Sequence, residues 1–263
     1  MHSNPDSTRR FSDRVDNYIR FRPRYPARML EFMRDELGLD QSHVIADIGS
    51  GTGFLTEAFL RNGNMVYGVE PNREMREAGE NLLRAYPNFQ SVEATAETTT
   101  LDDRSIDFIT AGQAFHWFDP VAARTEFRRI LKPEGYAVII WNTRKLDASP
   151  FLVAYEDLLR RYGTDYETVS MRTVSSAGGS VIEEFFAPFG HQRHVFADHN
   201  QYFDFEGLRG RLLSSSYTPT AADTGYEPML RELQEIFDRY QEGGTVKFEY
   251  ETELYYGRLH MVR

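Results

Sequence analysis

The segment VIADIGSGTG, residues Val44–Gly53, predicts the fold of this chain. Its first half is a run of apolar residues, as expected for a strand of a parallel sheet that is buried on both faces. Three glycines then alternate with small polar residues, which lets the backbone turn sharply and approach a ligand. A helical segment, Phe54–Leu60, follows directly. Strand, glycine-rich turn and helix in this order are typical of a cofactor site at the carboxyl end of a strand.

Asp47 is the one ionisable residue in this predicted strand. Burying a carboxylate is strongly unfavourable unless a partner compensates its charge. We therefore expect Asp47 to serve either the glycine turn or the ligand that binds there.

The spacing of the glycines distinguishes two families of cofactor-binding proteins. The dinucleotide fingerprint G-x-G-x-x-G requires glycine at position 54, which is Phe54. The observed pattern, D-x-G-x-G-x-G, instead resembles the first motif of the class I S-adenosylmethionine-dependent methyltransferases. We interpret Asp47 as an acid behind the turn that organises the glycine loop and helps to receive the methionine ammonium of such a cofactor, directly or through water. The resemblance implies a cofactor cradle made of Asp47, Gly49, Ser50, Gly51 and Gly53.

Length and composition limit the classes of protein. The chain has 263 residues, enough for one domain with a lid, and a net charge of -10, which argues against nucleic acid or an anionic membrane as partner. It has no cysteine, which excludes disulfides, thiolate zinc sites and a cysteine nucleophile. No segment has the apolar length of a membrane span, and the first residues lack the apolar core of a signal peptide. We therefore expect a cytoplasmic protein, monomeric or homodimeric.

Strand and helix patterns alternate five times up to Trp141, which predicts a mostly parallel sheet with right-handed crossovers. The second to fifth strands are expected at Met65–Val69, Phe89–Ala94, Phe108–Ala111 and Tyr136–Trp141. Two later strands are expected at His191–Phe203 and Thr245–Tyr256. By resemblance to the family, the last strand inserts antiparallel between the fifth and the sixth. The predicted fold class is α/β: a Rossmann-like, doubly wound, seven-stranded sheet with a helical lid.

Three regions are expected within a single domain. Residues 1–26 form an N-terminal segment that covers the cofactor, and residues 27–144 form the S-adenosylmethionine-binding core. Residues 145–263 supply lid insertions and the last two strands of the sheet.

Further cofactor contacts are expected at successive strand ends. Glu70 lies 17 positions after Gly53, where an acidic residue hydrogen-bonds the ribose of adenosine cofactors, and Pro71 follows it. The segment A-T-A-E resembles a family pattern in which residues at the positions of Ala96 and Glu97 meet the adenine ring and its amino group. In the segment G-Q-A-F-H-W-F-D, the resemblance places the following residues near the sulfonium: Gln113, Ala114 and Phe115.

The residues expected to face the methyl acceptor come from separate parts of the chain. The N-terminal pattern Y-x-x-x-R-P-x-Y-P resembles the trans-aconitate-methyltransferase-like subgroup, in which this segment folds over the cofactor. That resemblance implies cofactor contacts from Tyr18 and Arg22, although packing of these side chains on the core remains the alternative. The expected acceptor-facing residues are Tyr25, His116, Trp117, Arg144 and Tyr217, with His116 and Tyr217 as candidate catalytic residues.

The predicted function is S-adenosylmethionine-dependent methylation of a small molecule, with carboxylate O-methylation favoured. A carboxylate needs no general base, and an arginine such as Arg22, Arg24 or Arg144 would hold it. A hydroxyl, amine or carbon acceptor stays open, and a hydroxyl would use His116 as general base. A nucleotide-dependent oxidoreductase and a non-catalytic cofactor-binding module with the same fold are the alternatives. No metal is expected, because the histidine spacing around His191–His199 does not suit a metal site.

Overall fold

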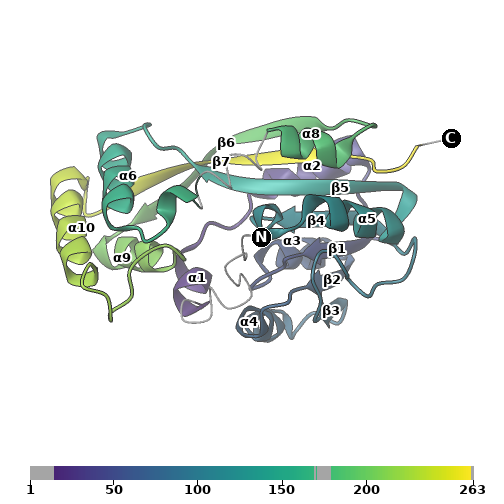
Figure 1. The fold of residues 1–263 in the computed structure, drawn as a ribbon, viewed down its shortest axis with the longest axis horizontal. Coiled ribbons are helices and arrows are strands. Elements are labelled where there is room, and N and C mark those ends of the chain that lie inside the picture. The colour runs from purple at the N-terminus through teal and green to yellow at the C-terminus, as the bar shows by residue number, and fades with distance from the viewer. Residues whose placement is uncertain (1–14, 169, 171–178, 262–263) are drawn as a thin grey trace.

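A seven-stranded sheet with the order β3-β2-β1-β4-β5-β7-β6 forms the centre of the molecule (Figure 1). The structure is a computed structural model that describes residues 15–168, 170 and 179–261. The strands are β1 (Val44–Ile48), β2 (Met65–Val69), β3 (Phe89–Val92), β4 (Ile106–Gly112), β5 (Leu131–Arg144), β6 (Gln192–Phe203) and β7 (Val246–Gly257). The first five pair in parallel, and β7 runs antiparallel to both β5 and β6. The predicted fold class, including the antiparallel insertion of the last strand, is confirmed.

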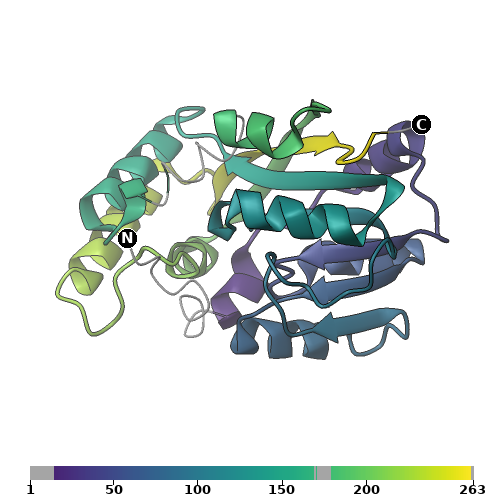
Figure 2. The same ribbon diagram turned by 45° about the vertical axis from the view of Figure 1, so that its right-hand side comes forward.

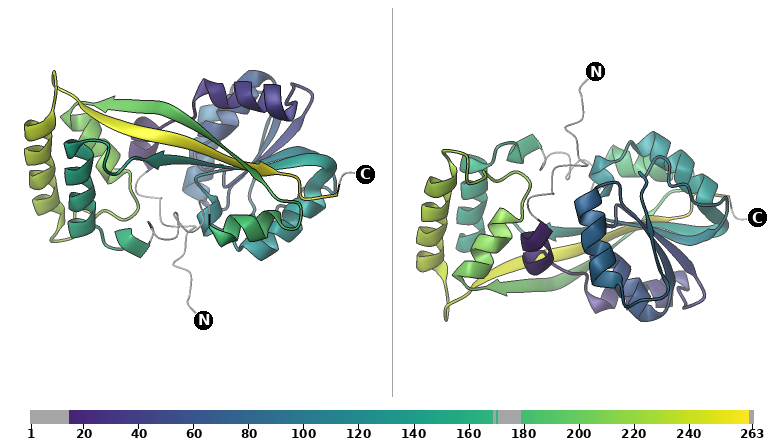
Figure 3. Two further views of the ribbon diagram at one scale, coloured as in Figure 1. Left: turned by 90° about the horizontal axis from the view of Figure 1, so that it is seen from above. Right: turned by 90° about the horizontal axis from the view of Figure 1, so that it is seen from below.

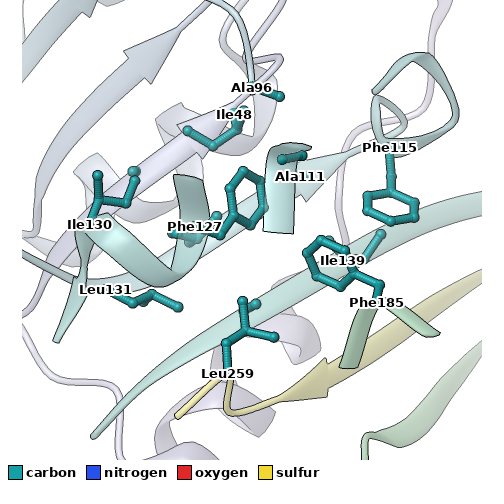
Figure 4. Close-up of a cluster of buried hydrophobic side chains, with 14 of the residues drawn as sticks. Ile48, Ala96, Ala111, Phe115, Phe127, Ile130, Leu131, Ile139, Phe185 and Leu259 are labelled. Atoms are coloured by element: carbon teal, nitrogen blue, oxygen red, sulfur yellow. The ribbon is translucent and has the colours of Figure 1, made fainter. Parts of the chain in front are cut away.

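Helices cover both faces of the sheet, as a doubly wound fold requires (Figure 2). One face packs against α2 (Ala27–Leu37), α3 (Phe54–Asn62) and α4 (Arg73–Leu83), through Met33, Phe59 and Leu83. The other face packs against α5 (Pro120–Ile130) and α8 (Ser180–Phe186), through Phe127 and Phe185. Figure 4 shows this second cluster.

Local sequence signals set the ends of the helices that approach the site. The side chain of Asn72 accepts a hydrogen bond from the backbone N–H of Met75 and caps the start of α4. Asp119 caps α5 in the same way, and it follows directly on the short 3-10 helix η2 (Phe115–Trp117) and Phe118. Both helices therefore begin close to the carboxyl ends of the parallel strands.

Strands β5, β6 and β7 are long and extend past the other strands (Figure 1). Their extensions carry three helices, which we call the cap helices: α6 (Pro150–Tyr162), α9 (Phe205–Leu213) and α10 (Tyr226–Tyr240). The cap helices have an apolar cluster of their own, which includes Leu152, Leu208, Leu233 and Phe248. This cluster packs the cap helices against one another and, through Phe248, against β7.

Helix α1 (Val15–Phe21) lies between the cap helices and the sheet core and contacts α9 and α4 (Figure 3). The predicted N-terminal segment therefore bridges the two parts of the molecule from residue 15 onward. Residues 1–14 of that segment lie outside the described residues.

Candidate functional site

The glycine turn after β1 takes a backbone conformation that favours glycine. Gly49, Gly51 and Gly53 have φ angles of 69°, 56° and 85°. A Cβ atom on Gly49 would lie 2.5 Å from the Cβ of Ala114, and one on Gly53 would lie 2.7 Å from Leu83 Cδ1. A Cβ on Gly51 would meet only the end of the Met75 side chain, at 3.4 Å. Gly49 and Gly53 thus permit close packing, whereas Gly51 faces open space.

Two buried carboxylates flank this turn. Asp47 accepts hydrogen bonds from the hydroxyls of Thr56, at 2.6 Å, and Thr110, at 3.0 Å. Burial raises the pKa of Asp47 to about 6, against the opposing effect of the two hydroxyls. Glu70 accepts the backbone N–H groups of Gly51 and Asn72, at 2.9 and 2.8 Å. Glu70, rather than Asp47, is therefore the acid that bonds a backbone N–H of the glycine turn.

A cavity of about 150 Å³, which we call the inner cavity, opens at the carboxyl ends of β1, β2 and β4. Nine of the predicted cofactor residues line it: Tyr18, Gly49, Gly51, Glu70, Pro71, Ala96, Glu97, Gln113 and Ala114. Trp117, which was predicted to face the acceptor, also lines it, and sequence reasoning missed five further lining residues: Asn72, Met75, Thr95, Gly112 and Phe118. Asn72 could have been found from its sequence, because an asparagine directly before a helix is a typical N-cap.

The residues of the inner cavity fit an adenosine cofactor. Glu70 presents a carboxylate at the end of β2, the position that holds ribose hydroxyls in sheets of this type. Ala96 offers a small apolar side chain, and Gly51 leaves space that a Cβ would partly fill. Glu97 is held in place by the backbone N–H of Asp119, which donates to its Oε1 at 2.9 Å.

Two predicted cofactor residues lie elsewhere. Phe115 is only 2% exposed and points into the core, with its ring centroid 4.9 Å from that of Phe185 (Figure 4). Gly53 begins α3 and packs against Leu83. The structure therefore places Phe115 and Gly53 behind the site, because the turn of η2 directs the Phe115 ring away from the inner cavity.

A second, smaller cavity of about 60 Å³, which we call the junction cavity, adjoins the glycine turn from the other side. It gathers four predicted residues that do not line the inner cavity: Arg22, Tyr25, Asp47 and Ser50. Tyr25 was expected to face the acceptor, but its hydroxyl packs against the backbone of Gly112. Burial raises the pKa of Tyr25 well above its ordinary value.

A third cavity of about 240 Å³, which we call the outer chamber, lies between the sheet core and the cap helices. Four of the five predicted acceptor residues converge there: His116, Trp117, Arg144 and Tyr217. Asn142 and Thr143, which follow the predicted fifth strand and were expected to face the acceptor, also line it. Sequence reasoning missed Tyr166, Arg211 and Tyr250. No local pattern marks these three residues, because they reach the chamber only when the segment after α6, α9 and β7 come together.

Gln113 belongs to all three cavities. It is a non-glycine residue with a φ angle of 58°, an unusual conformation that marks functional sites. Its side-chain Nε2 donates to the backbone carbonyl of Asn142 at 2.8 Å. This bond ties the end of β4 to the end of β5 at the boundary between the inner cavity and the outer chamber.

The charges that line the outer chamber are positive. Arg22, Arg144 and Arg211 line it, and no aspartate or glutamate does so among the described residues. Arg144 pairs with Glu156 at 2.6 Å, yet its Nη1 atom is buried and has no hydrogen-bond partner in the part of the chain that the structure describes. The chamber is thus cationic in a chain whose net charge is -10.

Residues 15–168, 170 and 179–261 contain neither a metal-binding cluster nor a membrane-spanning helix. No group of three or more His, Asp or Glu side chains in these ranges is arranged to hold a metal ion. No helix in these ranges has the length and apolar character that crossing a membrane requires.

Comparisons with known proteins agree with this geometry. Residues 46–139 match the methyltransferase domain family. An uncharacterized methyltransferase-like protein of Schizosaccharomyces pombe is 28% identical over 247 residues, which cover 92% of each chain. An uncharacterized methyltransferase of Mycobacterium tuberculosis is 35% identical over 142 residues, 54% of this chain and 56% of that protein.

The fold also matches a solved structure. A candidate type II methyltransferase of Anaeromyxobacter dehalogenans superposes with a TM-score of 0.66 at 19% identity, over 92% of this chain and all of that one. None of these matches supports the oxidoreductase alternative. The matched segment begins within β1 and spans the glycine turn, Glu70 and Gln113. The chain is therefore a class I S-adenosylmethionine-dependent methyltransferase.

Proposed function

We propose that the protein methylates a carboxylate oxygen of a small-molecule anion bound in the outer chamber. The observation that carries this proposal is the buried Nη1 of Arg144, which has no hydrogen-bond partner among the described residues. The Arg144 side chain is only 10% exposed, and Glu156 and Tyr166 contact its other terminal nitrogen, Nη2, at 2.6 and 3.4 Å. A buried donor left without an acceptor is costly, and a ligand carboxylate is the acceptor that an arginine prefers.

The charge of the chamber supports an anionic acceptor. Three guanidinium groups line it, and a bound cofactor would bring a further positive charge, its sulfonium. A cationic amine would bind against this field, whereas a carboxylate lowers the electrostatic energy of the whole site. A neutral hydroxyl would leave the charges uncompensated.

When bound, S-adenosylmethionine supplies a methyl group that its sulfonium has already activated. A carboxylate is ionised at neutral pH, so the protein has to position it and has no proton to remove. In this proposal Arg144 holds the carboxylate, and Gln113 fixes the boundary across which the methyl group passes. His116 and Tyr217 then form walls that exclude water, and neither acts as a general base.

The cofactor roles are part of the same proposal. Glu70 binds the ribose, Ala96 and Glu97 border the adenine, and the glycine turn with Asp47 receives the amino-acid end. The N-terminal pattern that resembles the trans-aconitate-methyltransferase-like subgroup supports a carboxylate acceptor. We place Tyr18 over the cofactor, because it lines the inner cavity and its ring lies 6.2 Å from that of Phe54.

A methyl-transfer screen tests the proposal. The full chain is incubated with methyl-labelled S-adenosylmethionine and panels of small carboxylates, phenols and amines. We expect label only with carboxylates, in a product that releases methanol on mild alkaline treatment, as a methyl ester does. Alkali-stable label on a phenol or amine, with none on the acids, contradicts the proposal. If no compound is labelled although the cofactor binds tightly, the result favours a non-catalytic cofactor-binding module.

A further inference from the structure

We infer that Arg22 and Arg211 together form a binding site for a ligand carboxylate, at the boundary between the junction cavity and the outer chamber. That carboxylate has two candidate sources: the amino-acid end of the cofactor, or a second acid group of the acceptor. The inference rests on the proposed function for the acceptor source alone, since the cofactor class is already established.

The two guanidinium groups share their hydrogen-bond acceptors at the end of α9. Arg22 donates to the Ser214 hydroxyl and carbonyl, both at 3.0 Å, and to the Ser215 hydroxyl at 3.3 Å. Arg211 donates to the same Ser215 hydroxyl at 3.2 Å and to Tyr250 at 3.1 Å. All of these acceptors are neutral, so two positive charges are held side by side.

No carboxylate compensates the pair within the described part of the chain. Arg211 is only 5% exposed, and neither arginine takes part in an ion pair there. Buried Arg144, by contrast, has Glu156. Burial and the charge of Arg211 lower the pKa of Arg22. Burial also acts to lower the pKa of Arg211, but the neighbouring tyrosines, Tyr250 foremost, outweigh it and keep that pKa above its ordinary value. Two like charges in such a place are strongly unfavourable without an anion, so the arrangement is one that a bound anion would stabilise.

The N–H groups of the two arginines that make no hydrogen bond to the protein are suited to bind a carboxylate. Among the described residues, Arg22 Nη1 and Arg211 Nη2 have no hydrogen-bond acceptor. Both side chains line the junction cavity and the outer chamber. The junction cavity also contains Asp47 and Ser50 of the cofactor cradle, and the outer chamber contains Arg144. The carboxylate of a cofactor in the junction cavity and that of an acceptor in the outer chamber are therefore both able to reach Arg22 and Arg211.

Isothermal titration of the full chain and its Arg211→Met variant separates the two sources. The probes are S-adenosylhomocysteine, 5′-methylthioadenosine, which lacks the amino-acid carboxylate, and glutarate added to the S-adenosylhomocysteine complex. If the cofactor supplies the carboxylate, the affinity for S-adenosylhomocysteine falls at least tenfold and that for methylthioadenosine stays the same. If the acceptor supplies it, both nucleosides bind as before and the glutarate heat is lost.

Other results overturn the inference. Unchanged binding of all three probes shows that the pair holds no ligand carboxylate, and an equal loss for both nucleosides shows a general structural role. Arg22→Met is the second variant, and it should change the binding of the same probes as Arg211→Met does. Arg124→Met is the matched control: Arg124 also donates only to neutral carbonyls, but it lies outside all three cavities.

A thermal readout distinguishes an anion site from a structural contact. Arg211→Met removes one of two like charges, so the unliganded variant should unfold at the same temperature as the wild type or higher. A purely structural arginine would lower the unfolding temperature. The titrations with the two nucleosides do not depend on methyl transfer. If the acceptor screen finds no substrate, they still show whether the arginine pair binds the carboxylate of the cofactor.

Discussion

Arg144, at the end of β5, and Glu156, in α6, form an ion pair of 2.6 Å that occupies only one side of the guanidinium group. Glu156 also accepts the hydroxyl of Tyr166 at 2.6 Å. The sheet core therefore provides the arginine and a cap helix provides the acid that orients it. The remaining nitrogen, Nη1, is buried and has no hydrogen-bond partner among the described residues, and Arg144 lines the outer chamber.

Arg144→Met should raise KM for a carboxylate acceptor by about 10- to 100-fold, because a hydrogen bond to a charged group contributes about 1.5–3 kcal/mol. Affinity for S-adenosylhomocysteine should stay within about twofold. Initial rates and calorimetric titration measure the two quantities. Arg193→Met is the control, because it breaks a comparable arginine–glutamate pair, with Glu253 at 2.9 Å, away from the three cavities. Equal kinetic effects in both variants would contradict the assigned role.

Gly51→Ala should abolish tight cofactor binding with a modest loss of stability. The added Cβ occupies space in the inner cavity, and the positive φ costs about 1–2 kcal/mol for alanine. Gly38→Ala is matched in backbone strain, because Gly38 has a φ of 70° and a Cβ there meets nothing within 4 Å. We expect equal shifts in the free energy of unfolding for both variants, but weaker binding of S-adenosylhomocysteine only for Gly51→Ala. Retained affinity in Gly51→Ala would place the cofactor elsewhere.

Asp47 should make the stability of the unliganded protein depend on pH. Its pKa in the folded state is about 6, above that of an unfolded aspartate, so the native state binds more protons between about pH 4 and 6. The free energy of unfolding therefore falls as the pH rises through this window, by ~3 kcal/mol relative to Asp47→Asn. Urea unfolding of both proteins from pH 4 to 7 measures the difference. Parallel curves would show that Asp47 does not titrate there.

Gln113→Ala should lower methyl transfer at least tenfold while the free energy of unfolding changes by about 1 kcal/mol, the typical contribution of its bond to the Asn142 carbonyl. The variant keeps the unfavourable positive φ and loses only the side-chain bond. Gln113→Gly should be more stable than Gln113→Ala, since glycine accepts this φ, yet equally slow. Rates near wild type in both variants would remove Gln113 from the boundary between cofactor and acceptor.

Local signals were sufficient for the cofactor side of the molecule. Apolar strands, the glycine turn and the acid at the next strand end are each encoded within a few consecutive residues. Parallel strands bring their carboxyl ends to one edge, so Gly51, Glu70 and Gln113 meet in the inner cavity as the pattern predicts. Phe115 and Gly53 are the exceptions. Whether the Phe115 ring faces the cavity or the core depends on a single turn of η2, and Gly53 packs behind the turn as the N-cap of α3.

The sequence by itself determined the strand–turn–helix of Val44–Leu60 and the Rossmann-like sheet, because these depend on short-range periodicity and on backbone conformations open to glycine. The class of cofactor followed from the resemblance of the D-x-G-x-G-x-G pattern to a known family. Only the tertiary structure placed Arg22, Arg144 and Arg211 in one chamber. They come from the N-terminal segment, β5 and α9, and no short-range pattern relates them. The electrostatic field around the acceptor is thus a property of packing between the cap helices and the sheet core, and it exists only once the chain has folded.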